Sequence, residues 1–352
     1  QALQLLLQII KSDNYPDAQC TLGDMYYNGI GVTQNCKEAV KWYTKAANQG
    51  NIKAQYILGN MYYIGERVNQ NLKEVVEWWG KAALQDHVES QVNLGEMYYN
   101  GIGVLKDYKQ AKQYFEKAKN KGNAVAQNYL GLIYLDGHGV DKDFKKAKQY
   151  FEKAEAKGNA SAQYKLGALY QMGQGVKQSF STAKKLFEKA AKQDFAKAQN
   201  SLGAMYAGAE GIRQNYTQAK KWFEKAAAQG NADAHYNLGL IYENALGVKE
   251  NITEAIKHFE KAAEKGHVHS QYRLGEIFLT TKNYKEAQIW LEKAANQDLA
   301  EAQFQLGLMC ENSKSVLSKS NSKAVEWYQK AAAQGYEPAK ICLAKLTKMG
   351  LM

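Results

Sequence analysis

The chain has 352 residues and a formal net charge of +11, from 46 Lys and Arg against 35 Asp and Glu. Its longest apolar run, at residues 5–10, is far shorter than the roughly 20 residues that a membrane-spanning helix needs, which argues against such a helix. The only two prolines, Pro16 and Pro338, lie near the ends, and no linker composition interrupts the sequence between them. We therefore predict one elongated domain over residues 1–352.

A Leu-Gly pair recurs through the chain at a fixed spacing. The glycines lie 36 residues apart from Gly23 to Gly275, and a ninth, Gly307, follows after 32 residues. This period is typical of stacked helical hairpins, in which each repeat contacts mainly its neighbours. We predict part of an earlier repeat in residues 1–15, nine repeats in residues 16–335 and a C-terminal capping helix in residues 336–352.

Each repeat is predicted to contain two helices, A and B. In repeat two, apolar residues between Ala54 and Tyr62 share one face of helix A, and Asn51 is a suitable N-cap. Helix A is expected to end at a Gly-x-Gly loop such as Gly29–Gly31, because glycine accepts the left-handed conformation. Helix B is expected to begin after a capping residue at Asn35, Asn71, Asp107, Asp143, Ser179, Asn215, Asn251, Asn283 or Ser320.

The repeated glycine lies in the middle of helix A, where glycine costs about 1 kcal/mol relative to alanine. Close approach of helix B would compensate for this cost, with one large side chain filling the space that glycine leaves. A lysine before the repeated alanine, from Lys45 to Lys330, is interpreted as a partner of the helix dipole whose stem covers apolar surface. The predicted large residues are Tyr43, Trp79, Phe115, Phe151, Phe187, Phe223, Phe259, Leu291 and Tyr328.

These repeated residues resemble the Sel-one-like repeat, a longer relative of the tetratricopeptide repeat, and the match covers nearly all of the chain. The resemblance implies an all-α, right-handed superhelical α-solenoid whose A helices line a concave face, with no catalytic residue and no cofactor. Within the family, the chain is similar to proteins that intracellular bacteria such as Legionella use to enter host cells. In repeat two the matching residues are Ala54, Gln55, Leu58, Gly59, Tyr62, Gly65, Trp78, Trp79, Lys81, Ala82 and Ala83.

The expected function is that of a non-enzymatic scaffold that binds protein or peptide partners. The resemblance favours a bacterial protein that engages host or bacterial proteins, with no small-molecule substrate. The sequence starts at Gln1 without a methionine, from which we infer a fragment or a processed chain. An export signal could have been removed, which leaves the localisation open, and we expect an exported or secreted bacterial protein whose N-terminal segment is missing. No nucleophile, base or pair of carboxylates departs from the repeat pattern in a way that predicts catalysis.

Partner recognition is expected at positions that vary between copies on the exposed concave side of helix A. Tyrosine supplies contact area with little entropy loss, and asparagine can bond an extended backbone. The alternative is that Tyr27, Tyr63 and Tyr99 pack against one another along this wall. The candidate residues are Asp24, Tyr27, Asn28, Tyr56, Asn60, Tyr63, Glu96, Tyr99, Asn100, Asn128, Tyr164 and Gln171.

The positive charge is concentrated in residues 106–225, which hold 23 Lys and Arg against 11 Asp and Glu. This region suggests a second function, recruitment to an acidic, phosphoinositide-like membrane, although a lysine-rich helix face is also ordinary solvated surface. Nucleic acid is not expected, because Arg213 is the only arginine there and base recognition usually relies on arginine. The candidate lysines are Lys112, Lys145, Lys146, Lys148, Lys184, Lys185, Lys220 and Lys221.

Two further patterns are not expected to be ligand sites. His267 and His269, with His235 one repeat earlier, form the one histidine cluster, but His267 occupies a helix N-cap position and His235 a repeated glutamine position. We expect surface histidines and no metal. The Gly-x-Gly loops follow a helix, whereas a dinucleotide-binding loop follows a strand, so we interpret them as helix ends.

Overall fold

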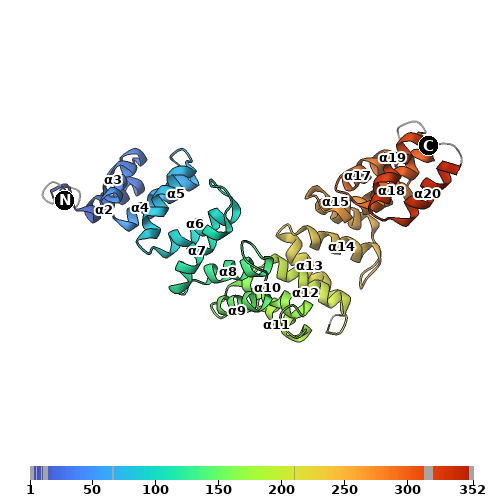
Figure 1. Cartoon of the computed structure of the whole chain (residues 1–352), viewed down its shortest axis with the longest axis horizontal. Coiled ribbons are helices and arrows are strands. Elements are labelled where there is room, and N and C mark those ends of the chain that lie inside the picture. Colours follow the sequence, from blue (N-terminus) through green and yellow to red (C-terminus); the bar gives the residue numbers. More distant parts are fainter. Residues whose placement is uncertain are drawn as a thin grey trace. The chain divides into compact units, whose positions relative to one another are not determined.

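The computed structural model describes residues 4, 6–8, 10, 15–65, 67–209, 211–312 and 320–348, and the regular elements in this part of the chain are α-helices (Figure 1). The structure forms two compact units, residues 1–178 and 179–352, and each is described by itself. Most of the partial repeat predicted at residues 1–15 lies outside the described residues, as do residues 349–352 of the predicted capping helix.

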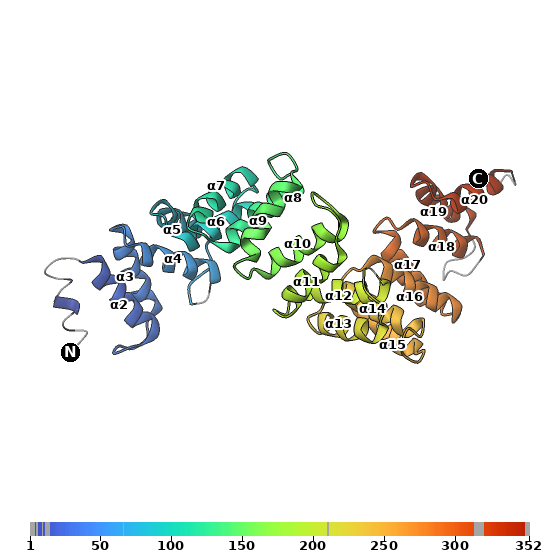
Figure 2. The ribbon, with the colours of Figure 1, turned by 90° about the horizontal axis from the view of Figure 1, so that it is seen from below.

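Even-numbered helices correspond to helix A and odd-numbered helices to helix B. Within each unit, a helix A packs on the helix B that follows it, and that helix B packs on the next helix A (Figure 2). The first unit contains α2 (Pro16–Asn28), α3 (Cys36–Asn48), α4 (Ile52–Ile64), α5 (Leu72–Leu84), α6 (Val88–Asn100), α7 (Tyr108–Asn120), α8 (Ala124–Asp136), α9 (Phe144–Glu155) and α10 (Ala160–Met172). The second contains α11 (Phe180–Ala191), α12 (Ala196–Gly208), α13 (Tyr216–Ala228), α14 (Ala232–Glu243), α15 (Ile252–Glu264), α16 (Val268–Thr280), α17 (Tyr284–Ala295), α18 (Ala300–Glu311), α19 (Asn321–Ala333) and α20 (Glu337–Lys348).

The helix ends follow the predicted capping chemistry. Each of the nine predicted N-caps of helix B accepts a hydrogen bond from a backbone N–H of the first turn. Glycines such as Gly29 and Gly101 end helix A in the left-handed conformation, at φ of 72° and 74°. Asp86, Asp194 and Asp298, each at a position where other repeats have glycine after helix B, also adopt the left-handed conformation.

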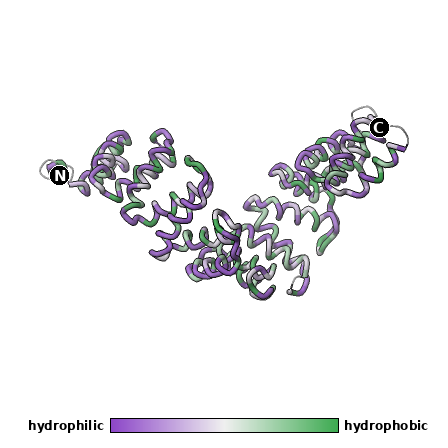
Figure 3. Tube along the Cα trace, in the orientation of Figure 1, coloured by the Kyte–Doolittle hydropathy of each residue, from purple (hydrophilic) through white to green (hydrophobic). Residues whose placement is uncertain are grey.

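The core of each hairpin is the predicted contact between glycine and a large side chain. A Cβ atom added at Gly95 would lie 2.5 Å from the ring of Phe115, and one added at Gly23 would lie 2.6 Å from the ring of Tyr43. The rings of Phe115 and Tyr43 are buried. Hydrophilic and hydrophobic residues alternate along the helices (Figure 3). The same contact occurs at Gly59, Gly131, Gly203, Gly239, Gly275 and Gly307.

In several repeats a buried glutamine joins helix A to the turn that precedes it. The side chain of Gln55 donates to the carbonyl of Ala47 at 2.9 Å and accepts from Gln85 at 2.9 Å. These bonds satisfy polar atoms that the packing removes from water. Equivalent side-chain bonds occur at Gln91, Gln199, Gln271 and Gln303.

The last-turn lysines cover aromatic rings, in agreement with their interpretation from the sequence. Lys81 lies over the ring of Trp78 at 4.0 Å from the centroid, three residues earlier in the same helix. The contact adds a cation–π attraction to the coverage of apolar surface. Lys45, Lys225, Lys293 and Lys330 lie over tryptophan rings in the same way.

The substitution Gly95→Ala tests the glycine contact. The added methyl group would overlap the buried Phe115 ring, so we expect a loss of about 1–3 kcal/mol in the free energy of unfolding. Gly80, inside α5, is the matched control because a Cβ atom there would meet nothing within 4 Å. Gly80→Ala should raise stability by about 0.5–1 kcal/mol. Equal effects of the two substitutions in urea unfolding would contradict the packing account.

His235 departs from the glutamine pattern and is buried, so the expectation of a surface histidine was wrong at this position. Its Nδ1 lies 3.1 Å from Nδ1 of His258 in α15. Desolvation is the largest of the causes that lower the pKa of His235 to about 4, and the charges of His258, Lys261 and Lys265 act in the same direction. The pKa of His258 is lowered as well, first by desolvation. Both rings are therefore neutral in the folded protein at neutral pH.

This pair predicts acid sensitivity. Between pH 6.5 and pH 4 the unfolded chain binds a proton at His235 that the folded chain does not, so stability falls as the pH falls. One unit of pKa depression corresponds to about 1.4 kcal/mol. His235→Gln should restore the repeated glutamine and flatten the dependence of the unfolding midpoint on pH. An unchanged dependence, measured by circular dichroism in matched buffers, would show that other groups are responsible.

Candidate functional site

Three surface hollows lie between neighbouring A helices of the first unit. The α2–α4 hollow has a volume of about 350 Å³, the α4–α6 hollow about 390 Å³ and the α8–α10 hollow about 270 Å³. They occupy equivalent places in successive repeats, because the same positions of helix A line each of them. The repeat geometry therefore forms the hollows, and the variable side chains decide their chemistry.

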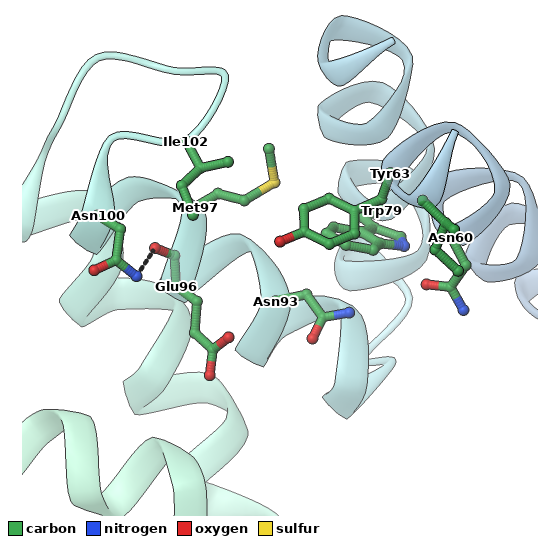
Figure 4. A pocket seen from close by; sticks show the side chains of 9 residues that line it. Asn60, Tyr63, Trp79, Asn93, Glu96, Met97, Asn100 and Ile102 are labelled. Carbon is green, nitrogen blue, oxygen red and sulfur yellow. Dashed lines mark hydrogen bonds between the residues drawn. The ribbon is translucent and has the colours of Figure 1, made fainter. Parts of the chain in front are cut away.

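The α4–α6 hollow combines aromatic walls with amide groups (Figure 4). The rings of Tyr63 and Trp79 lie 5.3 Å apart on one side, and Met97 and Ile102 lie on the other. Trp79 is itself the large residue that packs on Gly59, so the hairpin contact also forms a wall of the hollow. The full lining is Asn60, Tyr63, Ile64, Trp79, Asn93, Glu96, Met97, Asn100 and Ile102.

Glu96 is the charged residue of this hollow. Desolvation raises the pKa of its carboxyl group, and a hydrogen bond from Tyr129 opposes part of that shift. No Lys, Arg or His of the described residues lies within ion-pair distance of Glu96. The amide side chains of Asn60 and Asn93 also make no hydrogen bond within the described part of the chain. Among the described residues, the hollow thus presents one carboxylate without an ion-pair partner and two amide groups without an internal hydrogen bond.

The α2–α4 hollow has a carboxylate whose charge is already paired. Asp24 accepts a hydrogen bond from the Tyr43 hydroxyl at 2.8 Å and forms an ion pair with Lys53 at 2.6 Å. Asn60 and Ile64 line both this hollow and the α4–α6 hollow, which makes the two hollows adjacent. The remaining lining residues are Tyr27, Asn28, Tyr43, Ile57 and Met61.

Eight of the twelve predicted partner-binding residues line a hollow, and the other four do not. The ring of Tyr56 packs on His87 at 4.6 Å, and Tyr99 packs on Tyr108 and Tyr129. Asn128 is only 5% exposed. Gln171 lies at the end of α10, where its carbonyl accepts from Gln178. Those in the hollows are Asp24, Tyr27, Asn28, Asn60, Tyr63, Glu96, Asn100 and Tyr164.

The three tyrosines of the packing alternative contact other groups. Tyr63 packs on Trp79, and the Arg67 guanidinium lies over the Tyr27 ring at 5.1 Å. Tyr99 contacts the rings of Tyr108 and Tyr129 and forms a hydrogen bond with His138 at 3.4 Å. Tyr63 is 39% exposed and is the tyrosine of the three most open to a partner in the α4–α6 hollow.

The sequence analysis missed the helix A position that Asn93 and Ile57 occupy, although both line hollows. Internal variation could have revealed it, because eight residue types occupy this position in the nine copies. The equivalent residues are Thr21, Ile57, Asn93, Tyr129, Lys165, Ser201, Asn237, Arg273 and Gln305. Trp79 and Met97 were missed for another reason, since both belong to the core and show only one edge to the hollow.

The eight candidate lysines divide between the two units and differ in their pairing. Lys148, Lys184 and Lys220 form ion pairs with the glutamate one turn later, at 2.7, 3.2 and 3.0 Å. Lys146 pairs with Asp143 at 3.8 Å, and Lys112 lies over the Tyr134 ring. The members of the set that are exposed and unpaired are Lys145, Lys185 and Lys221.

The predicted histidine cluster does not converge on one point. The Nδ1 atom of His267 accepts from the backbone of Ser270 as an N-cap, whereas His235 bonds to His258. Across residues 15–348, apart from the undescribed positions, no three His, Cys, Asp or Glu side chains gather in a way that could hold a metal ion. None of the helices described there is both long and apolar enough to span a membrane.

The fold and its hollows define a helical-hairpin repeat protein. The Sel1 repeat model matches it in nine consecutive segments, and the chain belongs to the Sel1 repeat family. This confirms the predicted family and the all-α solenoid fold class. The matched segments are residues 16–51, 52–87, 88–123, 124–159, 160–195, 196–231, 232–267, 268–299 and 300–336.

The chain is similar to two solved structures from bacteria and to one curated viral protein. A protective antigen present in uropathogenic Escherichia coli strains is 30% identical, with a TM-score of 0.66, over 99% of this chain and 83% of that one. A Sel1 repeat protein from Oxalobacter formigenes is 29% identical, with a TM-score of 0.66, over 95% of each chain. A sel1-like repeat protein of Acanthamoeba polyphaga mimivirus is 53% identical over 34 residues, which span 10% of this chain and 6% of that protein.

Proposed function

We propose that the chain is a non-enzymatic scaffold that binds a protein segment along the A helices of its first unit. Sel1 repeat solenoids are typical of protein–protein interaction scaffolds. The observation that supports this surface is the pair of adjacent hollows that share Asn60 and Ile64. An elongated partner could occupy both hollows at once, which a globular small molecule could not.

The chemistry of the lining favours an extended peptide segment. Each asparagine side chain offers a carbonyl acceptor and an amide donor, which match the N–H and C=O groups of an extended backbone. Tyr63, which is 39% exposed, offers aromatic surface beside one edge of Trp79, and tyrosine yields contact area at small entropic cost. Backbone bonds would supply affinity and the hollows would select side chains, as in other modes of peptide recognition.

The origin and the partners of the chain are part of this proposal. Similarity to a protective antigen present in uropathogenic Escherichia coli strains supports a bacterial protein, and we propose that its partners are host or bacterial proteins. The similarity extends over most of both chains, so it is not limited to one repeat. Binding without nucleic acid and export from the cell stay predictions from the sequence.

The substitution Asn60→Ala tests the shared wall of the two hollows. It removes an amide that makes no internal hydrogen bond, so we expect at least a tenfold loss of affinity for a captured protein partner with little change in stability. Gln113→Ala, on an exposed position of α7, is the control. The measurement is capture of partners from bacterial and host lysates, followed by titration of the purified partner. A partner that binds wild type and Asn60→Ala equally would place its site elsewhere.

Tyr99→Ala distinguishes packing from binding in the same assay. Since Tyr99 contacts Tyr108, Tyr129 and His138, its removal should lower the thermal midpoint by several degrees. Tyr63→Ala should leave the midpoint nearly unchanged and weaken capture, because Tyr63 is exposed in the α4–α6 hollow. The reverse pattern would contradict the assignment of the two tyrosines.

Recruitment to an anionic membrane is a second proposal, supported by the exposed and unpaired Lys145, Lys185 and Lys221. Each lysine near such a surface contributes about 1 kcal/mol. Reversing all three to Glu should abolish salt-sensitive binding to phosphatidylserine vesicles in a sedimentation assay. Reversal of Lys148, Lys184 and Lys220, which already pair with glutamates, should have a smaller effect. Equal binding by wild type and the first triple variant would remove this proposal.

A further inference from the structure

The α4–α6 hollow has an equivalent five repeats later that the chain fills with its own side chain. A shift of 180 residues relates Tyr63 to Glu243, Asn93 to Arg273 and Glu96 to Glu276. The three later residues lie on α14 and α16, two neighbouring A helices of the second unit. The two places therefore share their backbone framework and differ in the side chains that occupy it.

Arg273 bridges two carboxylates at the later place. Its Nη2 lies 2.7 Å from an oxygen of Glu243, and its Nη1 lies 2.7 Å from an oxygen of Glu276 on the same helix. The Glu243 side chain is only 12% exposed, so this ion pair is shielded from water. A guanidinium group thus fits between two A helices of this repeat, with the glutamate at position 276 as one of its partners.

The α4–α6 hollow keeps the glutamate and lacks the guanidinium. Glu96 is equivalent to Glu276, but Asn93, at the position of Arg273, carries no charge. Tyr63 replaces Glu243 and lies beside Trp79, so aromatic rings stand where the second carboxylate would be. Figure 4 shows the carboxylate of Glu96 and the amide of Asn93 on the same helix, with the two rings opposite. The space that Arg273 fills in the later repeat is open here.

We propose that the α4–α6 hollow binds an arginine side chain of the partner's segment, with Glu96 as its ion-pair partner and Tyr63 and Trp79 as its aromatic wall. This inference rests on the proposed function and specifies its chemistry. The amides of Asn60 and Asn93 then bond the backbone or the remaining N–H groups of that arginine. The adjacent α2–α4 hollow, in which Lys53 already neutralises Asp24, receives an uncharged neighbouring residue.

Arginine fits better than lysine for two physical reasons. Its planar guanidinium can pair with a carboxylate through two N–H groups and can stack on an aromatic face at the same time. It is also more weakly hydrated than an ammonium group, so it loses less on entering a partly buried site. At the equivalent place in the second unit, the side chain that pairs with the glutamates is also an arginine, Arg273.

The desolvated carboxylate of Glu96 has an energetic cost, which a bound cation would offset. Burial without a positive partner raises the pKa of Glu96, which means that its ionised form is disfavoured in the folded protein. The stability lost through this group appears as the pH rises through its raised pKa. Glu96→Gln keeps an acceptor for Tyr129 and removes the charge, so this variant should be at least as stable as wild type at pH 7. A residue that lowers stability and gains binding is expected at a functional site.

The experiment is a titration of the full chain with N-acetyl-arginine amide, in which binding is measured from the NMR signal of the Trp79 indole N–H. That N–H donates to the carbonyl of Tyr56 at 3.3 Å, so it is a fixed reporter next to the hollow. N-acetyl-citrulline amide is the matched probe, since it has nearly the same shape and no charge. We expect binding of the arginine probe, in the millimolar range of small ligands, and at least tenfold weaker binding of the citrulline probe.

Three variants locate the site. Glu96→Gln should weaken the arginine probe at least tenfold, while Glu77→Gln, an exposed glutamate of α5, should leave its affinity unchanged. Asn93→Arg places a guanidinium three residues before Glu96, as Arg273 stands before Glu276. It should raise the thermal midpoint and abolish probe binding, because the chain then fills its own hollow. Circular dichroism confirms that each variant is folded.

Several results would overturn the inference. Equal affinity for the arginine and citrulline probes would show that charge is not recognised. Unchanged binding of the arginine probe by Glu96→Gln would show that Glu96 is not its ion-pair partner. No binding of the arginine probe to wild type would also reject it. If partner capture then still depends on Asn60, the proposed function stands and only the arginine assignment fails. If the probe binds but capture does not depend on Asn60, the scaffold surface lies elsewhere.

Discussion

The contact between the glycine of helix A and the large side chain of helix B is the constraint on which the rest of the structure depends. It holds the two helices so close that a methyl group at Gly95 would overlap Phe115. Because the same contact returns in successive hairpins, neighbouring A helices take up similar spacings, and the hollows between them recur at equivalent positions. The repeated residues of helix A and helix B thus form the core, and the residues that vary between repeats line the hollows on a regular backbone framework.

The sequence predicts the fold in detail because each local signal occurs many times. A single asparagine before a helix is a weak indication, but nine caps at equivalent positions are a strong one, and all nine accept the expected backbone hydrogen bonds. The prediction was weaker where a repeat departs from the others. His235 was expected on the surface, yet the shared framework buries whatever residue stands at the glutamine position, and a second histidine had to supply the bond.

The site was predictable only in part, because a hollow depends on neighbours that one repeat does not contain. Tyr63 and Tyr99 are equivalent in the sequence, but Tyr99 meets Tyr108 and Tyr129, whereas Tyr63 remains exposed beside Trp79. Asn128 has the polarity of a binding residue and is nevertheless buried. Variation between copies identifies surface that is free to change, but the size of side chains in the adjacent repeat decides whether that surface is open or packed.

Repeat architecture also explains how equivalent spaces between neighbouring A helices can be open in one repeat and filled by a side chain in another. In a solenoid, stability is approximately the sum of terms from each repeat and its neighbours, so a costly group in one repeat does not spread along the stack. Arg273 closes the space between α14 and α16 with two ion pairs, while Asn93 leaves the space between α4 and α6 open. Desolvation raises the pKa of Glu96, and within the described residues its carboxylate has no ion-pair partner. In the proposal, Tyr63 and Asn93 distinguish the binding repeat from the structural repeat, which has Glu243 and Arg273 at the equivalent positions.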